Sequence, residues 1–595
     1  MKKTLASAIL LTALNANAAL GPIPIYLNTE YRTDSPVIGS IASTLKFDAE
    51  DIKATAADTF LEFLATVPSV GLVDANGNVP AVFLRGGNSN HTLVLVDGVS
   101  INDISSPSGA VSYGLTNIAL NDIEKIEIIK GSGSVLYGSS AISGIIAITT
   151  KKGADGENAT ISTKYGTHNA KTYNLSASSG NTDGFIRFTH NKYTTNGIDA
   201  QSADDGDEKD SIDNQTTQIK VGNKRFDIGF LKSNTKTEYD TFGSSSGTNP
   251  AGLIDNNLTK ILLNANQQFS NILHTKLSFS QTKNNRNTGA NATTIGDKYK
   301  STNITILNDI KIDSALLNIG LSQIKDENIT DNQKISSKDV FVNFQKSIES
   351  VDINTGVRLI DNSRFANENI YNFGLVKYLD NGIKIISNYS TAFSAPSIGR
   401  LFGYGANLEL KPETSKNIEL GLEKQHYWGV SNIKFYKNNI KDLIVFNNDY
   451  VNPKYLNADK LISKGVELSV NANITGYNVG FSHNYNDSKI NDSTIQSVRR
   501  PKNTSNLTIS KKYDKFNSRV QIIKKSSSLD DTTFDGAGDK KLAGYTLINL
   551  STAYDFNTNA NISLNINNAL DKDYTIVDGY NQLGRTVTVG LNYNF

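Results

Sequence analysis

Apolar and polar side chains alternate along most of the chain after residue 153. In the last segment, RTVTVGLNYNF, one face carries Val587, Val589, Leu591, Tyr593 and Phe595, and the residues between them form the other face. A period of two predicts a β-strand with one apolar side. The segments LINLSTAYDF and ANISLNIN repeat the pattern. We therefore expect a long series of strands that are apolar on one side only.

The connections between these strands differ in length. Short turns such as DFNTNAN alternate with longer polar stretches such as SSSLDDTTFDGAGDKK, an asymmetry typical of outer-membrane barrels. A secreted β-sandwich or repeat array would also alternate, but it would normally show a repeat period. At about ten residues per strand and about ten per connection, residues 154–595 predict an all-β transmembrane barrel of about 22 antiparallel strands.

The part before residue 154 has a different character. Residues 1–18 carry Lys2 and Lys3, an apolar stretch and the small-residue sequence Ala16-Asn17-Ala18, which predicts a secretory signal peptide. Residues 19–35 form a linker. Residues 36–153 combine a helix-like stretch at 49–70 with apolar strands at 81–86, 91–98, 123–131 and 143–153. We expect this mixed α/β unit to be a plug domain inside the lumen, because a barrel this wide needs one.

Composition excludes several classes of protein. The formal net charge is +1 and the chain has no cysteine, which argues against nucleic-acid binding and excludes disulfides and thiolate metal sites. No apolar run after the N-terminus reaches the ~20 residues of a spanning helix. The segment GSGSVLYG lacks the GK[ST] ending of a phosphate-binding loop, so we interpret its glycines as turns. With no catalytic constellation, we do not expect an enzyme.

Three segments carry a family resemblance. FLRGGNSNHTLVLVDGV, IEKIEIIKGSGSVLYGSSAISGIIAITTKKG and NNALDKDYTIVDGYNQLGRTVTVGLNYNF resemble TonB-dependent outer-membrane receptors. YSTAFSAPSIGRLFGYGANLELKPETSKNIELGLE, YKNNIKDLIVF and LISKGVELSV are most similar to the cobalamin receptors of that family, although ferric-siderophore receptors share several of them.

The resemblance implies active import across the Gram-negative outer membrane, driven by TonB with ExbB and ExbD. Cobalamin is the expected substrate, and a ferric siderophore or haem is the alternative. From a different class, the residues alone leave open a passive pore or a surface adhesin in the membrane lipid.

The resemblance also places a TonB box just after the signal peptide. By position it comprises Pro24, Ile25, Tyr26, Leu27, Asn28, Thr29 and Glu30. A strand-like peptide suits this role because TonB can add it as an extra strand by edge pairing. The segment departs from the usual pattern in Tyr26, in Asn28 and in lacking a leading acid. An ordinary flexible leader is the alternative.

Two glutamates are expected to point into the lumen. In KNIELGLE the apolar Ile418, Leu420 and Leu422 would face lipid, which turns Glu419 inward; SKGVELSV places Glu467 likewise. The resemblance implies a latch of two plug cations against two barrel glutamates, and the matching cations are Arg85 and Lys130. A lysine cannot form the bidentate fork of arginine, so we expect the contact made by Lys130 to be the weaker part of the latch. Alternatively, the glutamates face lumenal water.

An acidic segment, GIDAQSADDGDEKDSID, and the following EYDTFGSSSGTNPAGLID are candidates for structural calcium binding, because calcium takes six to eight oxygen ligands. The EF-hand spacing is absent. The positions that match calcium-ordered loops of similar receptors are Asp199, Asp207, Asp210, Asp213, Tyr239, Asp240 and Asp255. A solvated acidic loop is the alternative.

Substrate contacts are expected at the plug apex and in one barrel loop. The resemblance implies Asn88, with Val79 and Ala81 nearby, although Ala81 replaces a hydroxyl residue. In SVRRPKN, either Arg499 or Arg500 matches a contacting arginine. An arginine there could hydrogen-bond corrin amides or the carboxylates of an iron chelate.

Overall fold

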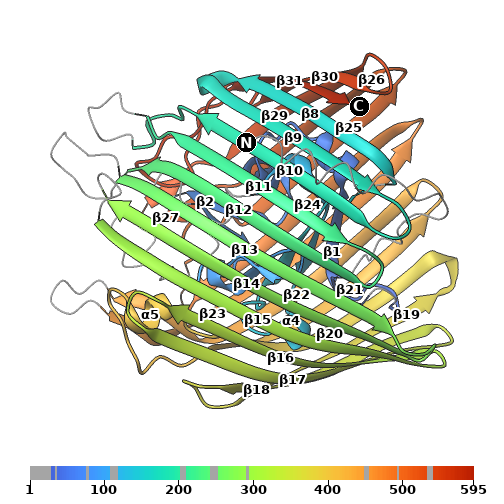
Figure 1. The fold of residues 1–595 in the computed structure, drawn as a ribbon, viewed down its shortest axis with the longest axis vertical. Helices are drawn as coiled ribbons and strands as arrows, with labels where there is room; N and C mark the ends of the chain where they lie inside the picture. The colour runs from blue at the N-terminus through green and yellow to red at the C-terminus, as the bar shows by residue number, and fades with distance from the viewer. Residues whose placement is uncertain are drawn as a thin grey trace, which may run out of the picture.

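A closed antiparallel barrel of 22 strands surrounds the N-terminal part of the chain (Figure 1). The computed structural model describes residues 29–33, 36–74, 80–106, 115, 118–153, 155–201, 209–240, 252–289, 294–447, 454–491, 493, 495–531 and 540–595. The barrel closes where β31 pairs with β8, for example Thr588 opposite Gly166. This confirms the predicted barrel and plug.

The barrel strands follow one another around the wall in chain order. They are β8 (Gly156–Gly166), β9 (Ala170–Gly180), β10 (Phe185–Thr195), β11 (Ile212–Gly222), β12 (Phe226–Tyr239), β13 (Gly252–Gln268), β14 (Leu273–Gly289), β15 (Thr294–Ile312), β16 (Ala315–Asn328), β17 (Gln333–Ile348), β18 (Val351–Asn362), β19 (Glu368–Leu379), β20 (Ile383–Ser394), β21 (Glu413–His426), β22 (Gly429–Asn447), β23 (Lys454–Ile474), β24 (Tyr477–Ile490), β25 (Asn503–Tyr513), β26 (Phe516–Lys525), β29 (Tyr545–Asp555), β30 (Ala560–Asn567) and β31 (Thr586–Asn594).

The alternation seen in the sequence sets the two faces of the wall. Val587 and Leu591 of the last strand, and Phe595 directly after it, are exposed on the outside, whereas Thr588 is buried on the inside. Since the backbone of every strand is paired around the closed ring, such a wall can sit in lipid without unsatisfied groups. No helix in the described part of the chain is long and apolar enough to span a membrane.

The two ends of the barrel differ. At one end, here called the turn end, strands are joined by two to four residues, as at 313–314 and 475–476. At the other, the loop end, the connections include 196–211, 395–412 and 568–585. One of them, 526–544, contains a small hairpin of β27 (Ser528–Asp530) and β28 (Lys540–Leu542). Another carries the short helix α5 (Ile398–Phe402). Short 3-10 helices η4 (Thr167–Asn169) and η5 (Asp380–Gly382) join two strand pairs.

The plug is built on a five-stranded mixed sheet of order β1-β6-β7-β4-β5. Only β4 and β7 run parallel. Its elements are β1 (Ser43–Asp48), α2 (Ala49–Lys53), α3 (Phe60–Thr66), β2 (Val70–Asp74), β3 (Pro80–Leu84), η1 (Ser89–His91), β4 (Thr92–Val96), β5 (Val99–Ser100), η3 (Leu120–Asp122), β6 (Ile123–Lys130), α4 (Ser134–Tyr137) and β7 (Gly144–Thr150).

Both faces of the plug sheet are covered. Phe63 and Leu64 of α3 pack with Ile126 and Ile146 on one face, and Leu93 packs with Ile129 and Ile145 on the other. Strands buried on both faces read as continuous apolar runs, which is why these segments do not alternate as the barrel strands do.

The helix-like stretch at 49–70 forms two short helices instead of one. Asp48 caps α2 and accepts from Asp51 N at 2.8 Å, and Thr59 caps α3 through Glu62 N at 3.2 Å. Side chains that bond the backbone in this way favour a new helix start over helix continuation. Likewise, GSGSVLYG is more than a set of turns, because it contains the single-turn helix α4 between Gly133 and Gly138.

Candidate functional site

A buried charge cluster joins the plug to the wall. Arg85 follows β3 and has a left-handed backbone, with φ of 47°, which turns its side chain out of the plug. Its Nε and Nη2 donate to the two carboxylate oxygens of Glu467 at 3.1 and 2.9 Å, and its Nη1 lies 3.0 Å from Glu419 Oε1. The guanidinium stacks on Tyr436, 4.4 Å from the ring centroid. The two glutamates come from β21 and β23, on either side of the strand that carries the tyrosine.

Lys130 completes this cluster from the end of β6. Its ammonium lies 3.0 Å from Glu467 Oε2, while Asn417 Nδ2 donates to Glu419 at 2.8 Å. Burial lowers the pKa of Lys130 despite that carboxylate. Burial would also lower the pKa of Arg85, but Glu419 and Glu467 outweigh it and hold that pKa above its ordinary value. The structure thus brings the four residues together, with one bidentate arginine and one single-contact lysine.

The plug loop after Arg85 is held by a partly buried arginine in the connection between β24 and β25. Arg500 donates to Asn88 Oδ1 at 2.9 Å and to the carbonyl oxygens of Gly86 and Gly87 at 3.3 and 3.4 Å. Its guanidinium stacks on Phe83 at 4.4 Å. Burial, with some contribution from Arg499, lowers the pKa of Arg500 to about 10. Among the described residues, Arg500 donates its hydrogen bonds to neutral oxygens, which leaves its charge available to an acceptor-rich ligand.

The other expected substrate residues lie elsewhere. Arg499 turns away and pairs with Asp530 in the 526–544 connection, Nε to Oδ1 at 2.6 Å. Ala81 lies in the β2–β3 hairpin opposite Val73. Val79 lies outside the described residues. Of the two candidate arginines, Arg500 is therefore the one that meets the plug loop.

A third buried carboxylate near this loop, Glu413, was not foreseen from the sequence. Glu413, at the start of β21, accepts from Asn90 Nδ2 at 2.5 Å and from Ile444 N at 3.0 Å. His91 Nε2 lies 3.3 Å from it. Because Asn88 N donates to His91 Nδ1 at 3.0 Å, the proton of the ring is on Nε2, facing the glutamate. The cluster ties the loop that carries Asn88 to the wall.

A second unforeseen contact lies at α4. Arg358 of β18 donates to Asp339 Oδ2 at 2.9 Å through Nε and to Val135 O at 3.2 Å through Nη1. Arg32 donates to Leu136 O at 2.9 Å from the plug side. The alternation that predicted inward glutamates also places Arg358 inward, between the outward Val357 and Leu359, so the signal was present in the sequence.

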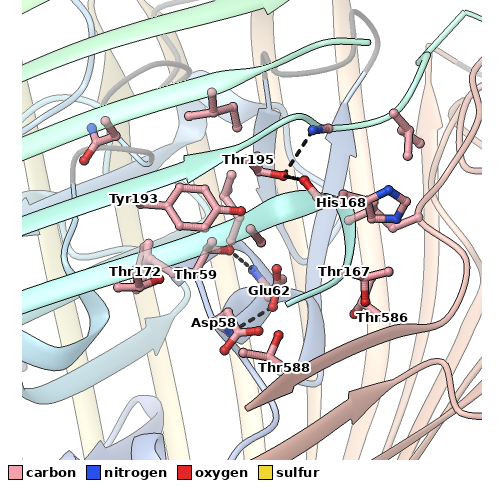
Figure 2. Close-up of a pocket in the computed structure, with 18 of the residues that line it drawn as sticks. Asp58, Thr59, Glu62, Thr167, His168, Thr172, Tyr193, Thr195, Thr586 and Thr588 are labelled. Carbon is pink, nitrogen blue, oxygen red and sulfur yellow. Dashed lines mark hydrogen bonds between the residues drawn. The ribbon is translucent and has the colours of Figure 1, made fainter. Parts of the chain in front are cut away.

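Among the cavities that the described residues leave between plug and wall, the two of largest volume reach toward the loop end. One, of about 280 Å³, lies between α3 and the part of the wall where β31 meets β8 (Figure 2). Asp58, Thr59 and Glu62 of the plug face Tyr193 across it. Burial, reinforced by the carboxylate of Asp58, raises the pKa of Glu62 to about 7. The other, of about 230 Å³, reaches Asn90 and the 395–400 segment. Both fall short of the 300–1,000 Å³ that is roughly typical of ligand pockets.

Comparison with known proteins decides the family. A model of the TonB-dependent receptor plug domain matches residues 36–145, and a model of the TonB-dependent receptor-like β-barrel matches residues 153–569. The chain belongs to the TonB-dependent receptor family. This confirms the resemblance seen in the sequence and places the chain among outer-membrane receptors rather than enzymes.

The chain is similar in sequence to a vitamin B12 transporter and in fold to solved structures of a siderophore receptor and an iron transporter. The vitamin B12 transporter BtuB of Photobacterium profundum is 26% identical over 600 residues, covering 95% of each chain. The siderophore receptor PirA from Acinetobacter baumannii has a TM-score of 0.77 at 15% identity, covering 93% of this chain and 98% of PirA. The FrpB iron transporter from Neisseria meningitidis (F3-3 variant) has a TM-score of 0.79 at 14% identity, covering 94% and 100%. The two structural likenesses show the fold alone.

The end of the expected TonB box is packed in the receptor's plug. Thr29 donates to Glu127 Oε2 at 2.5 Å, and Glu30 accepts from the backbone of Ile41 and Ala42 at 2.7 and 2.8 Å. An extended segment free for TonB would thus end before these two residues. Pro24, Ile25, Tyr26, Leu27 and Asn28 lie outside the described residues.

Of the acidic residues expected to bind calcium at the loop end, only some lie close to one another. Asp210 accepts from Ala200 N at 3.1 Å, beside Asp199, and Glu238 N donates to Ser211 O at 2.9 Å. This pairing sets Tyr239 and Asp240 next to Asp210, at neighbouring strand ends. Asp213 instead faces Lys192 at 3.5 Å, and Asp255 accepts from Asn257 at 3.0 Å. Asp207 lies outside the described residues.

Proposed function

We propose that this receptor imports cobalamin across the Gram-negative outer membrane by TonB-dependent transport. The observation that carries the proposal is the end-to-end match to a vitamin B12 transporter, which covers 95% of each chain. The contact between Asn88 and Arg500 supports it, because it sets a guanidinium with neutral partners beside the plug apex. Corrin side-chain amides offer acceptors to such a donor.

A ferric siderophore is the second candidate substrate, since Arg500 would equally bind the carboxylates of an iron chelate. Relatives with this fold include a siderophore receptor and an iron transporter. Haem falls under the same alternative.

Competition binding separates the two substrates. Purified receptor is expected to bind cyanocobalamin, and an excess of ferric chelate should leave that binding unchanged. In Arg500→Gln, binding should weaken by about tenfold, because a charge-assisted hydrogen bond contributes about 1.5 kcal/mol or more. Arg499→Gln is the matched control. If a chelate binds and cobalamin does not, the substrate is wrong while the family stands.

In this proposal the energy comes from TonB with ExbB and ExbD, and the receptor's own residues transmit it. TonB pairs with the segment from Pro24 to Asn28 as an added strand. The cluster of Arg85, Lys130, Glu419 and Glu467 acts as the latch that seats the plug.

A structural calcium ion at the loop end belongs to the same proposal. The carboxylate of Asp240 is fully buried, and both its oxygens lack a hydrogen-bond donor among the described residues. A buried carboxylate of this kind needs a cation. Asp210 is its nearest candidate co-ligand by register. However, no group of three or more acidic or histidine side chains within the described ranges is arranged to hold a metal, so the proposed site needs further oxygens.

Removal of calcium tests this site. We expect chelation of calcium to weaken cobalamin binding. We expect Asp240→Asn to weaken cobalamin binding as well, and to abolish the calcium binding that calorimetry measures in the wild type. Asp213→Asn is the control, since that side chain is half exposed and faces a lysine. Unchanged cobalamin affinity after chelation would remove calcium from the proposal.

A further inference from the structure

The larger of the two cavities contains a carboxylate that lacks an ion pair of its own. Glu62 of α3 lies in its lining, and one oxygen, Oε2, accepts from Asp58 N at 2.8 Å and from Asn567 Nδ2 at 3.4 Å. Lys164 pairs with the neighbouring Asp58 instead, Nζ to Oδ1 at 2.9 Å. None of the described residues that line the cavity is a lysine or an arginine. Glu62 therefore presents to the cavity an acid that no lining cation neutralises.

Three polar side chains of the wall line the same cavity. Thr172 of β9, Asn191 of β10 and Thr588 of β31 are only 6%, 7% and 6% exposed. Within the described part of the chain, none of these side chains has a hydrogen-bond partner. Figure 2 shows Thr172 and Thr588 around the same space as Glu62. Since buried polar groups are normally hydrogen-bonded, these oxygens are free to accept from a molecule in the cavity.

Tyrosine rings form another part of the lining. Tyr193 comes from β10, and Tyr574 and Tyr580 come from the 568–585 connection. Tyr574 packs against Tyr545 with ring centroids 4.5 Å apart, which restricts its orientation. The faces of tyrosine rings attract cations. The aromatic lining and the unpaired acid thus favour a ligand of the same, positive sign.

The plug supplies an apolar side, and the volume limits what can enter. Leu61, Leu115 and Ile118 line the cavity. Its volume of about 280 Å³ lies just below the range of roughly 300–1,000 Å³ that holds drug-sized ligands, so it suits a smaller molecule. Such a molecule would have a short hydrocarbon part and a cationic end.

We propose that this cavity binds a small primary amine as its ammonium ion, a ligand additional to the transported substrate. An ammonium group has three donors, which the carboxylate of Glu62 and the wall oxygens can accept, while the alkyl part lies against the apolar plug residues. Because α3 belongs to the plug and the other strands to the wall, the bound amine joins the two. A ligand that binds only the assembled state stabilises that state. The inference does not depend on which substrate the receptor transports.

Titration calorimetry of the purified receptor with n-butylammonium and with 1-butanol tests this site, since the two probes have the same alkyl chain and differ in charge. The wild type should bind the amine at least about tenfold more tightly, because charge-assisted hydrogen bonds are stronger than neutral ones. Glu62→Gln keeps an acceptor for Asp58 N and should lose that preference. Glu50→Gln is the matched control, because Glu50 is an exposed residue of α2 that does not line the cavity.

The pH dependence of binding gives a second measurement. Burial and Asp58 raise the pKa of Glu62 to about 7, so its carboxylate forms as the pH rises through that value. A primary amine stays protonated there, because its pKa is about 10. Wild-type affinity for butylammonium should therefore increase across this range, whereas that of Glu62→Gln should not. The other charged or titratable groups around Glu62 are Asp58, Lys164, Tyr193 and Tyr574, with His168 and Asp210 elsewhere in the lining.

Equal affinity for the two probes, an unchanged preference in Glu62→Gln, or an equal loss in Glu50→Gln would overturn the proposal. Cobalamin binding should be unchanged in Glu62→Gln, since neither Asn88 nor Arg500 lines this cavity. Failure here is thus distinct from failure of the proposed transport function.

Discussion

Reversing the charge of Glu467 is expected to unseat the plug. In Glu467→Arg, the guanidinium of Arg85 and the ammonium of Lys130 would face a third cation in a buried space. Breaking a buried ion pair by removing one partner costs about 3–5 kcal/mol, and the added repulsion increases that cost. The expected result is a barrel that still assembles but conducts ions in planar bilayers and exposes plug sites to protease.

A second substitution separates pairing from general damage. Adding Arg85→Glu to Glu467→Arg restores opposite charges across the same contact and should recover a closed barrel. Glu423→Arg is the matched control, because Glu423 pairs with Lys384 at a partly exposed site where an ion pair contributes only about 1 kcal/mol or less. A double variant that leaks as much as the single one would show that these charges do not seat the plug.

Deleting Pro24 to Asn28 should abolish cobalamin uptake by cells and leave binding to the purified receptor intact. The reason is that transport needs a strand that TonB can pair with, whereas the proposed substrate contacts, Asn88 and Arg500, come from other parts of the chain. The deletion stops at Asn28 because Glu30 accepts two backbone hydrogen bonds within the plug. Uptake by radiolabelled cobalamin and affinity by calorimetry measure the two properties separately.

Glu30→Gln serves as the comparison for this deletion. The amide retains one acceptor oxygen for Ile41 and Ala42 but loses the charge, so it should loosen the plug without removing the segment proposed to pair with TonB. If the deletion variant still transports cobalamin, energy does not enter through this segment, and a passive pathway becomes the better explanation.

The inward-facing glutamates Glu419 and Glu467 show what the alternation of apolar and polar residues alone can predict. Glu419 and Glu467 were predicted to face the lumen because apolar neighbours on both sides must face outward, and both are buried. The same rule applied to Arg358 would have found the contact at α4. In contrast, nothing local distinguishes Arg499 from Arg500, since adjacent residues in a connection have no fixed period, and only the positions of Asn88 and Asp530 separate them.

The sequence by itself determined the barrel, its approximate strand number, the two faces of its wall and the existence of a separate folded plug, because side-chain periodicity and turn chemistry act over a few residues. Only the tertiary structure decided which charges meet across the plug–wall boundary. Those contacts join residues hundreds of positions apart, such as Arg85 with Glu467 and Asn90 with Glu413. Their geometry depends on how deep the plug sits and on strand register around a closed ring, which no local pattern contains.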